Sequence, residues 1–567
     1  MHERTGGTRR VVAALLAFAL LVSACGTTNT SPSAPAGTAG ATASPSGDAS
    51  PTSPTGSDAA PPEGELVVGL AAESESMDPY LVYQTAGISI MSAIFDTLLT
   101  VANDGTLGPG LATEWTVKDP TTIDLTLRDD VVFHDGEPFG ADAVRFSIYR
   151  ILDRDTDTGD PLPKGQGIGS SMSSDYASIE SVQVVDDAHV TLKLARPDAA
   201  LPAALGRLFI VPPDDVTQKG NEGFAAAPVG TGPFRFVEWK KDDHTLVTVN
   251  EDYWDSPRGK PMVDTVRFRP LTDPTTRLNE LTAGGIDIMQ DATVDQQSTI
   301  EGAGGALVHR DDDPHHVEIW LTTDGIAPPG ADAATTTAIE AFMKPEVRQA
   351  LNMGIDRQTI IDALLGGLGK PMSQLFVEGE QGHDPSIQPF AYDPGGAKLA
   401  LEQAGYPDGL DVTLDYCTCD RLDPIEAAVA DLADIGVRAT IKPMEIGQFN
   451  QTWGRPNGDN PGTDPMRSSR LSFNDPNTFL QLWWKKDGFL SRYDEPQMDE
   501  LIAKQLSEYD PAARVKTLNE IAALSHEKPG AIYLWSSPNL YAVGPNVQGW
   551  EPHFSGYLPV VNVARTG

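Results

Sequence analysis

The sequence predicts an α/β fold, because strand-like and helix-like segments alternate along most of its 567 residues. One strand–helix–strand unit gives the clearest evidence. Residues 410–416 (LDVTLDY) alternate apolar and polar side chains, as a strand with one buried face does. Residues 437–441 (VRATI) repeat this alternation after a helical segment. Two strands joined through a helix form a βαβ unit, so at least part of the sheet is expected to be parallel.

The helix between these strands carries signals at both ends. Asp423 is expected to cap its N-terminus, with Pro424 at the first helical position. An apolar stripe at helical spacing follows, and Gly436 ends the helix. The same Asp-Pro start recurs at 393–394 and 510–511. Helices of this kind between strands support the α/β prediction.

Residues 1–24 have the pattern of a secretory signal peptide. Three arginines precede an unbroken apolar run of twelve residues, 11–22. That run is too short to cross a hydrocarbon core of about 30 Å as a helix. It ends in a Val-Ser-Ala-Cys sequence that resembles the lipobox of bacterial lipoproteins. We therefore expect Cys25 to be acylated after cleavage; the alternative is an ordinary signal peptide followed by a chance cysteine.

The segment after the predicted lipidation site is expected to be a disordered tether, residues 25–64. Its residues are almost all Gly, Ala, Ser, Thr and Pro, with no aromatic side chain and little charge. Such a composition cannot bury enough apolar surface to fold. As a flexible coil it would span about 35 Å. It would hold a domain away from a bilayer, with the lipid as the membrane anchor.

The remainder of the chain is expected to be water-soluble and acidic. Its length is enough for two or more lobes, and no further apolar run could span a membrane. The formal charge of −39 repels nucleic acid, so no nucleic-acid partner is expected. Beyond Cys25 only Cys417 and Cys419 remain, too few for a disulfide framework. Their spacing does not match structural zinc sites, and we expect no metal and no cofactor.

A series of short sequence blocks is spread over most of residues 65–567. They are 111–115 (LATEW), 124–128 (DLTLR), 132–136 (VFHDG), 141–146 (ADAVRF), 228–234 (PVGTGPF), 250–254 (NEDYW), 273–277 (DPTTR) with 286–287 (ID), 347–352 (VRQALN) with 355–357 (IDR), and 404–409 (AGYPDG). In sequence and in order, these blocks resemble the family 5 extracellular solute-binding proteins, the peptide, oligopeptide and nickel-chelate receptors of ATP-driven importers.

The resemblance implies a two-lobe clamshell, similar to periplasmic binding proteins, with two crossovers between the lobes. Lobe I is expected to combine residues 65–290 with 535–567, and lobe II to comprise residues 291–534. Hinge closure would trap a small-molecule or peptide ligand and present it to the permease subunits of an ABC transporter. We expect a monomer, lipid-anchored on the outer face of the cytoplasmic membrane or in the periplasm.

A secreted hydrolase is the rival class, and the residues give it little support. The chain has no Gly-x-Ser-x-Gly and no His-Glu-x-x-His motif. The sequence 134–136 (HDG) is interpreted as a turn, and 165–169 as a flexible glycine-rich loop. His315 and His316 would point to opposite faces of a strand, which argues against a shared site. We therefore expect no catalytic residues and no enzymatic activity.

The resemblance suggests which residues contact the ligand. Where peptide-binding relatives usually carry an amine-binding aspartate, this chain has Ser472. Arg421 occupies a loop in which dipeptide-binding relatives place a carboxylate-binding arginine, and Arg467 and Arg470 lie near Ser472. Arginine suits carboxylates. Ser472 argues against recognition of a free amine, and together these residues favour a ligand with an acidic group and no required free amine. The function we expect is capture of a peptide-like small solute; the alternatives are an opine-like acid, a metal chelate, an oligosaccharide, or a receptor that only senses or scaffolds.

Further candidate ligand residues come from two other regions. Phe473, Asn474 and Trp483 lie in an aromatic-rich stretch near Ser472, and Cys417 ends a strand where α/β folds place ligands. Glu75, Ser76 and Met77 follow the first strand, in a loop that lines the cleft in relatives. Asp78, which comes next, is interpreted as the cap that orders this turn.

Overall fold

The chain was analysed as a computed structural model, which describes residues 63–103, 105–254, 256–311, 315–418, 421–456, 460, 462–471 and 475–566. The predicted signal peptide, Cys25 and the tether lie outside these ranges. So do Cys419, Ser472, Phe473 and Asn474. Within the described ranges, no helix has the length and apolar character needed to cross a membrane.

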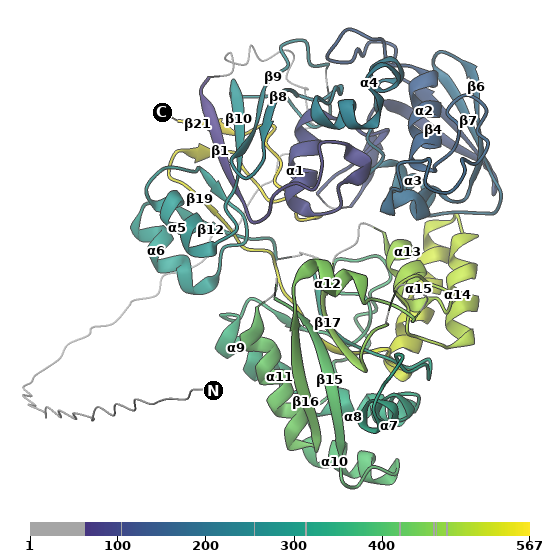
Figure 1. Ribbon diagram of the computed structural model, residues 1–567, viewed down its shortest axis with the longest axis vertical. Coiled ribbons are helices and arrows are strands. Elements are labelled where there is room, and N and C mark those ends of the chain that lie inside the picture. Colours follow the sequence, from purple (N-terminus) through teal and green to yellow (C-terminus); the bar gives the residue numbers. More distant parts are fainter. Residues whose placement is uncertain are drawn as a thin grey trace, which may run out of the picture. The chain divides into compact units, whose positions relative to one another are not determined.

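A seven-stranded mixed sheet organises the first part of the body (Figure 1). Its central strand β1 pairs in parallel with β10 on one side and β11 on the other. In spatial order the strands are β12 (Ala306–Val308), β19 (Tyr541–Val543), β11 (Ile288–Met289), β1 (Glu65–Leu70), β10 (Thr265–Pro270), β9 (His244–Val249) and β8 (Phe234–Lys240).

A six-stranded sheet organises the middle of the chain. Its strands in spatial order are β14 (Lys370–Pro371), β18 (Ala531–Ser536), β13 (His316–Leu321), β17 (Met466–Leu471), β15 (Leu410–Cys417) and β16 (Val437–Met444). Side chains alternate between its two faces. Ile319 and Leu321 face one buried core, whereas Trp320 faces a second, aromatic-rich core.

Three smaller sheets complete the strands. The four-stranded sheet is antiparallel and consists of β4 (Ala112–Asp119), β5 (Thr122–Leu127), β7 (His189–Leu194) and β6 (Ile179–Asp186). The two-stranded sheets are β2 (Leu99–Val101) with β3 (Leu107–Pro109), and β20 (Val547–Gln548) with β21 (Ala564–Arg565).

The helices mostly connect or cover these strands. They are α1 (Thr85–Ile94), α2 (Ala141–Ile151), α3 (Leu201–Leu205), α4 (Pro213–Ala226), α5 (Pro274–Thr282), α6 (Gln297–Gly302), α7 (Ala333–Phe342), α8 (Pro345–Met353), α9 (Arg357–Leu364), α10 (Pro394–Gln403), α11 (Leu422–Asp434), α12 (Ile446–Gln451), α13 (Pro476–Phe479), α14 (Pro496–Leu506) and α15 (Pro511–Glu527). Short 3₁₀ turns are η1 (Pro79–Leu81), η2 (Ser171–Tyr176) and η3 (Val294–Gln296), and a π-helical turn, η4 (Leu480–Trp484), directly follows α13.

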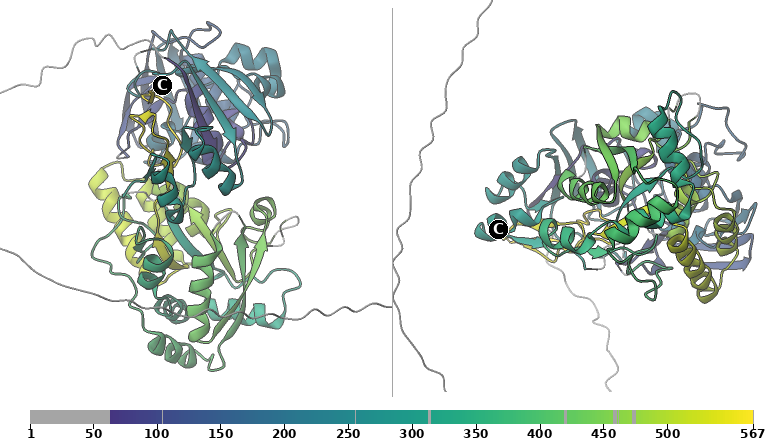
Figure 2. Two further views of the ribbon diagram at one scale, coloured as in Figure 1. Left: turned by 90° about the vertical axis from the view of Figure 1, so that its left-hand side faces the viewer. Right: turned by 90° about the horizontal axis from the view of Figure 1, so that it is seen from below.

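The chain passes between the two large sheets twice. It leaves the seven-stranded sheet after β12 and enters the six-stranded sheet at β13; it returns after β18, when β19 pairs antiparallel with both β11 and β12. The C-terminal segment, yellow in the pictures, lies beside the strands of the seven-stranded sheet in both orientations (Figure 1, Figure 2). The predicted lobe boundaries near 290 and 535 stay predictions.

The predicted βαβ unit is confirmed. Strands β15 and β16 pair in parallel over their full length, and α11 connects them in the sequence. Asp393 and Asp510 cap α10 and α15 as predicted, accepting from the backbone N–H groups of Gly396 and Ala513.

The predicted start of α11 is wrong by a small shift. This helix begins at Leu422, and its N-cap residue is Arg421 rather than Asp423. Proline is tolerated throughout the first turn, where backbone N–H groups have no partner inside the helix, so Pro424 did not mark the first position. The carboxylate of Asp423 pairs with Arg421 instead of capping the backbone.

A buried ion pair orders the loop after β1. Asp78 accepts from the Tyr80 N–H, which confirms its predicted capping role, and both of its carboxylate oxygens accept from the Arg150 guanidinium on α2. Asp78 is fully buried and the Arg150 side chain is 4% exposed. Because each charge neutralises the other inside the core, loss of either leaves an unpaired buried charge.

Replacement of Asp78 by alanine should lower the free energy of unfolding by about 3–5 kcal/mol, since Arg150 would stay buried without its anion. Urea denaturation followed by circular dichroism measures this change. Asp411→Ala is the matched control, because it removes an exposed carboxylate paired with Arg438 and should alter stability little. Similar, small losses in both variants would contradict a structural role for the Asp78–Arg150 pair.

Candidate functional site

A cavity of about 770 Å³ lies where segments of both large-sheet regions meet. Most of its wall comes from α1, β2, the residues after α3, and the C-terminal segment between Gly549 and Val563. Thr478 of α13 and Trp483 of the π-helical turn close it from the other side. This volume lies within the range of about 300–1,000 Å³ that is usual for small-molecule sites.

Aromatic rings form the rigid part of the wall. Trp483 is 7% exposed and meets Trp453 edge to face, with ring centroids 5.7 Å apart. Trp550 meets Tyr541 in the same way at 5.2 Å, and Tyr557 stacks on His553 at 4.2 Å. Burial lowers the pKa of His553 to about 4, so its imidazole is neutral at physiological pH. This part of the wall is thus largely apolar, and its ring contacts hold the aromatic side chains in fixed orientations.

The charged groups of the wall are mostly cationic, although the chain carries a formal charge of −39. Arg207 and Arg258 line the cavity, and among the described lining residues Glu551 is the one carboxylate. Arg207 pairs with Asp175 at 3.3 Å and Arg258 with Asp96 at 2.6 Å. Sequence reasoning missed both arginines, because their place in the wall depends on segments far apart in the chain.

Among the predicted ligand residues, Trp483 lies in this cavity wall and the loop residues 75–77 do not. Met77 is fully buried in the core and Ser76 accepts from the Asp78 N–H. Glu75 accepts from the backbone N–H of Gln84, the N-cap residue of α1. Burial raises the pKa of Glu75. This loop therefore positions α1, whose residues line the cavity, without lining it.

The two predicted arginines lie elsewhere. Arg421 is 40% exposed at the start of α11 and pairs with Asp423 at 2.6 Å. Arg470 is exposed on β17 and donates to Asn539. Cys417 is fully buried at the end of β15 and is disulfide-bonded. None of the three lines the cavity, and their predicted ligand contacts stay predictions, as do those of Ser472, Phe473 and Asn474, which lie outside the described residues.

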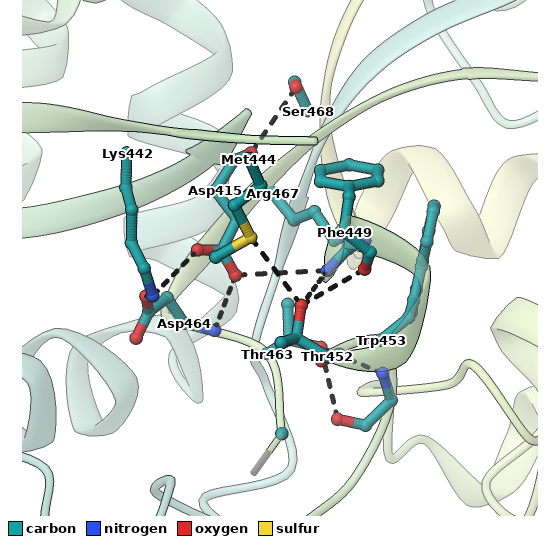
Figure 3. A network of polar contacts seen from close by, with 12 residues as sticks. Asp415, Lys442, Met444, Phe449, Thr452, Trp453, Thr463, Asp464, Arg467 and Ser468 are labelled. Carbon is teal, nitrogen blue, oxygen red and sulfur yellow. Dashed lines mark hydrogen bonds and ion pairs between the residues drawn. The ribbon is translucent and has the colours of Figure 1, made fainter. Parts of the chain in front are cut away.

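Arg467, near Ser472 in the sequence, is part of a buried network (Figure 3). Its side chain is fully buried, with the guanidinium 3.4 Å above the centroid of the Phe449 ring and 4.1 Å from that of Trp453. It donates to the Phe449 carbonyl and to Thr452, and lies 4.0 Å from Asp415. Burial lowers the pKa of Arg467 to about 9. These contacts hold Trp453, which in turn packs against Trp483.

Arg467→Ala should lower the free energy of unfolding by about 2–4 kcal/mol, because it removes a buried guanidinium that packs on two aromatic rings and lies near the Asp415 carboxylate. Burial raises the pKa of Asp415 to about 6, so the effect should be larger at pH 8 than at pH 5, where this carboxyl is mostly protonated. Urea denaturation at the two pH values tests this, with Arg438→Ala on the neighbouring exposed strand as the control. An unchanged stability would show that Arg467 is dispensable to the fold.

The adjacent histidines point to different partners. The His315 ring lies 3.1 Å from Asn539, whereas Nε2 of His316 lies 2.8 Å from Glu380. His316 and Glu318 are both fully buried, and Nδ1 of His316 is 3.7 Å from a Glu318 oxygen. Burial opposes the imidazolium, but Glu380 and Glu318 outweigh it and raise the pKa of His316 to about 10. No group of three or more metal-ligating side chains occurs among the described residues.

This cluster predicts a pH dependence of stability. Folding raises the pKa of His316 from 6.5 to about 10, so its stabilising contribution is complete below pH 6.5 and is lost as the pH rises through 10. Burial also raises the pKa of Glu318, which acts in the same direction. The free energy of unfolding, measured by urea denaturation from pH 6.5 to 10, should fall more steeply for wild type than for His316→Asn. The exposed His189→Asn variant should parallel wild type; equal slopes for wild type and His316→Asn would contradict this assignment.

The wider comparison with known proteins agrees with the fold. The model of the bacterial extracellular solute-binding proteins, family 5 (middle region), matches residues 106–490. The glutathione-binding protein GsiB of Salmonella typhimurium is 28% identical over 392 residues, which cover 68% of this chain and 70% of the relative.

Two solved structures are also similar. DppA of Helicobacter pylori, in complex with the peptide STSA, superposes with a TM-score of 0.75 at 24% identity, over 89% of this chain and 98% of that protein. AgaA of A. tumefaciens R10, in complex with agropinic acid, has a TM-score of 0.73 at 25% identity, over 89% and 99%. The predicted two-lobe α/β class is confirmed by these structures.

Proposed function

Because the chain belongs to the bacterial extracellular solute-binding proteins of family 5, we propose that it captures a small peptide-like solute outside the cytoplasm and delivers it to the permease of an ABC importer. The observation that carries this proposal is the 770 Å³ cavity, which both large-sheet regions line. An aromatic wall supplies apolar contact, and the arginines and hydroxyl groups supply directional polar contacts.

The names of the similar proteins support a peptide-like ligand. The similar relative binds glutathione, and the structure of DppA contains a short peptide. An acidic opine-like solute is the second candidate, because AgaA was solved with agropinic acid and the cavity wall carries two arginines. Both kinds of ligand carry carboxylates, and both are small molecules, for which a cavity of about 770 Å³ is usual.

Closure around the ligand would be a hinge motion at the two crossovers. Ser537 on the returning crossover donates to the His315 carbonyl on the outgoing one at 3.2 Å, and the His315 ring contacts Asn539. Two adjoining crossovers are the usual site of a hinge, since a few backbone torsions there rotate one lobe against the other. A ligand that contacts both lobes binds the closed form better and so shifts the population towards it.

The remaining parts of the proposal concern location and chemistry. Acylation at Cys25 would anchor the protein to the outer face of the membrane, with residues 25–64 as the tether and the permease as its membrane partner. The similar proteins are described as binding proteins, which supports a role without catalysis. We propose that no bond of the ligand is made or broken.

Ligand capture predicts stabilisation of the purified protein. In a thermal-shift screen with glutathione, pooled di- to tetrapeptides, agropinic acid, metal–histidine chelates and oligosaccharides, a true ligand at 100 times its Kd should add about 2.7 kcal/mol to the free energy of unfolding. Trp483 should report binding by a change in tryptophan fluorescence that Trp483→Phe reduces. Chemical turnover of a stabilising compound, followed by mass spectrometry, would contradict a pure binding function.

A further inference from the structure

Of the two arginines in the cavity wall, Arg207 makes far fewer contacts with the protein than Arg258. Arg258 donates to the carbonyls of Ser92 and Phe95, to Asp96 and to the Tyr253 hydroxyl. The Arg207 guanidinium makes one ion pair, 3.3 Å from Asp175, and no hydrogen bond among the described residues. A guanidinium has five N–H donors, so most of those of Arg207 can serve a ligand.

The partner of Arg207 is itself shared. Asp175 lies behind the wall with a side chain 9% exposed, and it accepts from the Thr478 hydroxyl at 3.2 Å. Burial raises the pKa of Asp175, and Arg207 opposes that rise. The Asp175 carboxylate therefore contacts both Arg207 and Thr478. These two residues line the cavity, Arg207 after α3 and Thr478 on α13. The Arg207 side chain is 29% exposed and lines the cavity, where it can bind a second anion.

A second group in the wall also lacks a partner. Trp550 is 8% exposed, and among the described residues its buried Nε1–H has no acceptor. A buried N–H group without an acceptor is costly, and such groups are normally satisfied by a neighbouring group, water or ligand. Trp550 lines the same cavity as Arg207, but its Nε1 has almost no accessible surface there, so the ring contributes apolar wall and not a donor to the ligand.

We propose that the cavity selects a solute bearing a carboxylate, which Arg207 binds. This inference rests on the proposed function and adds the charge class of its ligand. The planar fork of arginine can bind both carboxylate oxygens, whereas Asp175, held by Thr478, keeps the guanidinium in place. A ligand with a neutral group in this position would lose the charge-assisted hydrogen bonds.

The test compares each carboxylate-bearing compound of the binding screen with its uncharged amide, by isothermal titration calorimetry. Wild type should bind the acid at least about tenfold more tightly than the amide, the ratio expected when a charge-assisted hydrogen bond is lost. Arg207→Gln should bind acid and amide alike, and Arg207→Lys should recover part of the difference.

Two further variants sharpen the experiment. Arg438→Gln is the control, because it removes an exposed arginine, also paired with an aspartate, on β16 and should leave both affinities unchanged. Arg421→Gln tests the rival position, since Arg421 was predicted from the sequence to bind a carboxylate. Apo melting temperatures of all variants check that each is folded.

The outcomes separate this inference from the proposed function. If the amide binds as tightly as the acid, or if Arg421→Gln rather than Arg207→Gln removes the difference, the assignment of Arg207 is overturned while ligand capture stands. If no compound in either form binds the wild-type protein, both the inference and the proposed function are contradicted. Selective loss of acid binding in Arg207→Gln supports the inference.

Discussion

The return of the chain to its first large sheet is the constraint on which the cavity depends. Strand β19 inserts between β11 and β12 and forms hydrogen bonds with both, so the last residues must follow it back to that sheet. The segment from Gly549 to Val563 is thereby placed against α1, where it forms much of the cavity wall. Without this strand pairing, Trp550 and Tyr557 would have no fixed position relative to Arg207.

Buried charge is used in two different ways around this cavity. Asp78 with Arg150, and Arg467 with its aromatic neighbours, are enclosed by protein groups, so they fix backbone and ring positions. Arg207 is instead left partly exposed, with a partner that it shares with Thr478. This difference in exposure to the cavity, rather than the presence of an arginine, distinguishes a structural cation from one available to a ligand.

Local patterns predicted the elements well, and of the predicted ligand residues that the structure describes, Trp483 lies in the cavity wall. Alternation in 410–416 and the Asp-Pro starts at Asp393 and Asp510 depend on contacts within a few residues, and they are confirmed. The start of α11 shifted because a proline in the first turn does not mark one position. Glu75 and Met77, predicted to contact the ligand, do not line this cavity: Glu75 accepts from the Gln84 N–H and Met77 is fully buried, in a loop whose Asp78 pairs with the buried Arg150.

The sequence by itself determined the α/β class, the family resemblance and the caps of α10 and α15, because periodicity, caps and collinear motifs are local properties of the chain. Only the tertiary structure decided which side chains surround the cavity. Arg207 lies far in the sequence from Trp483 and Trp550, and sheet pairing and the two crossovers bring the three together. The sequence offers several arginines and tryptophans without ranking them, whereas the structure shows which of them line the cavity and how far each is bonded within the protein.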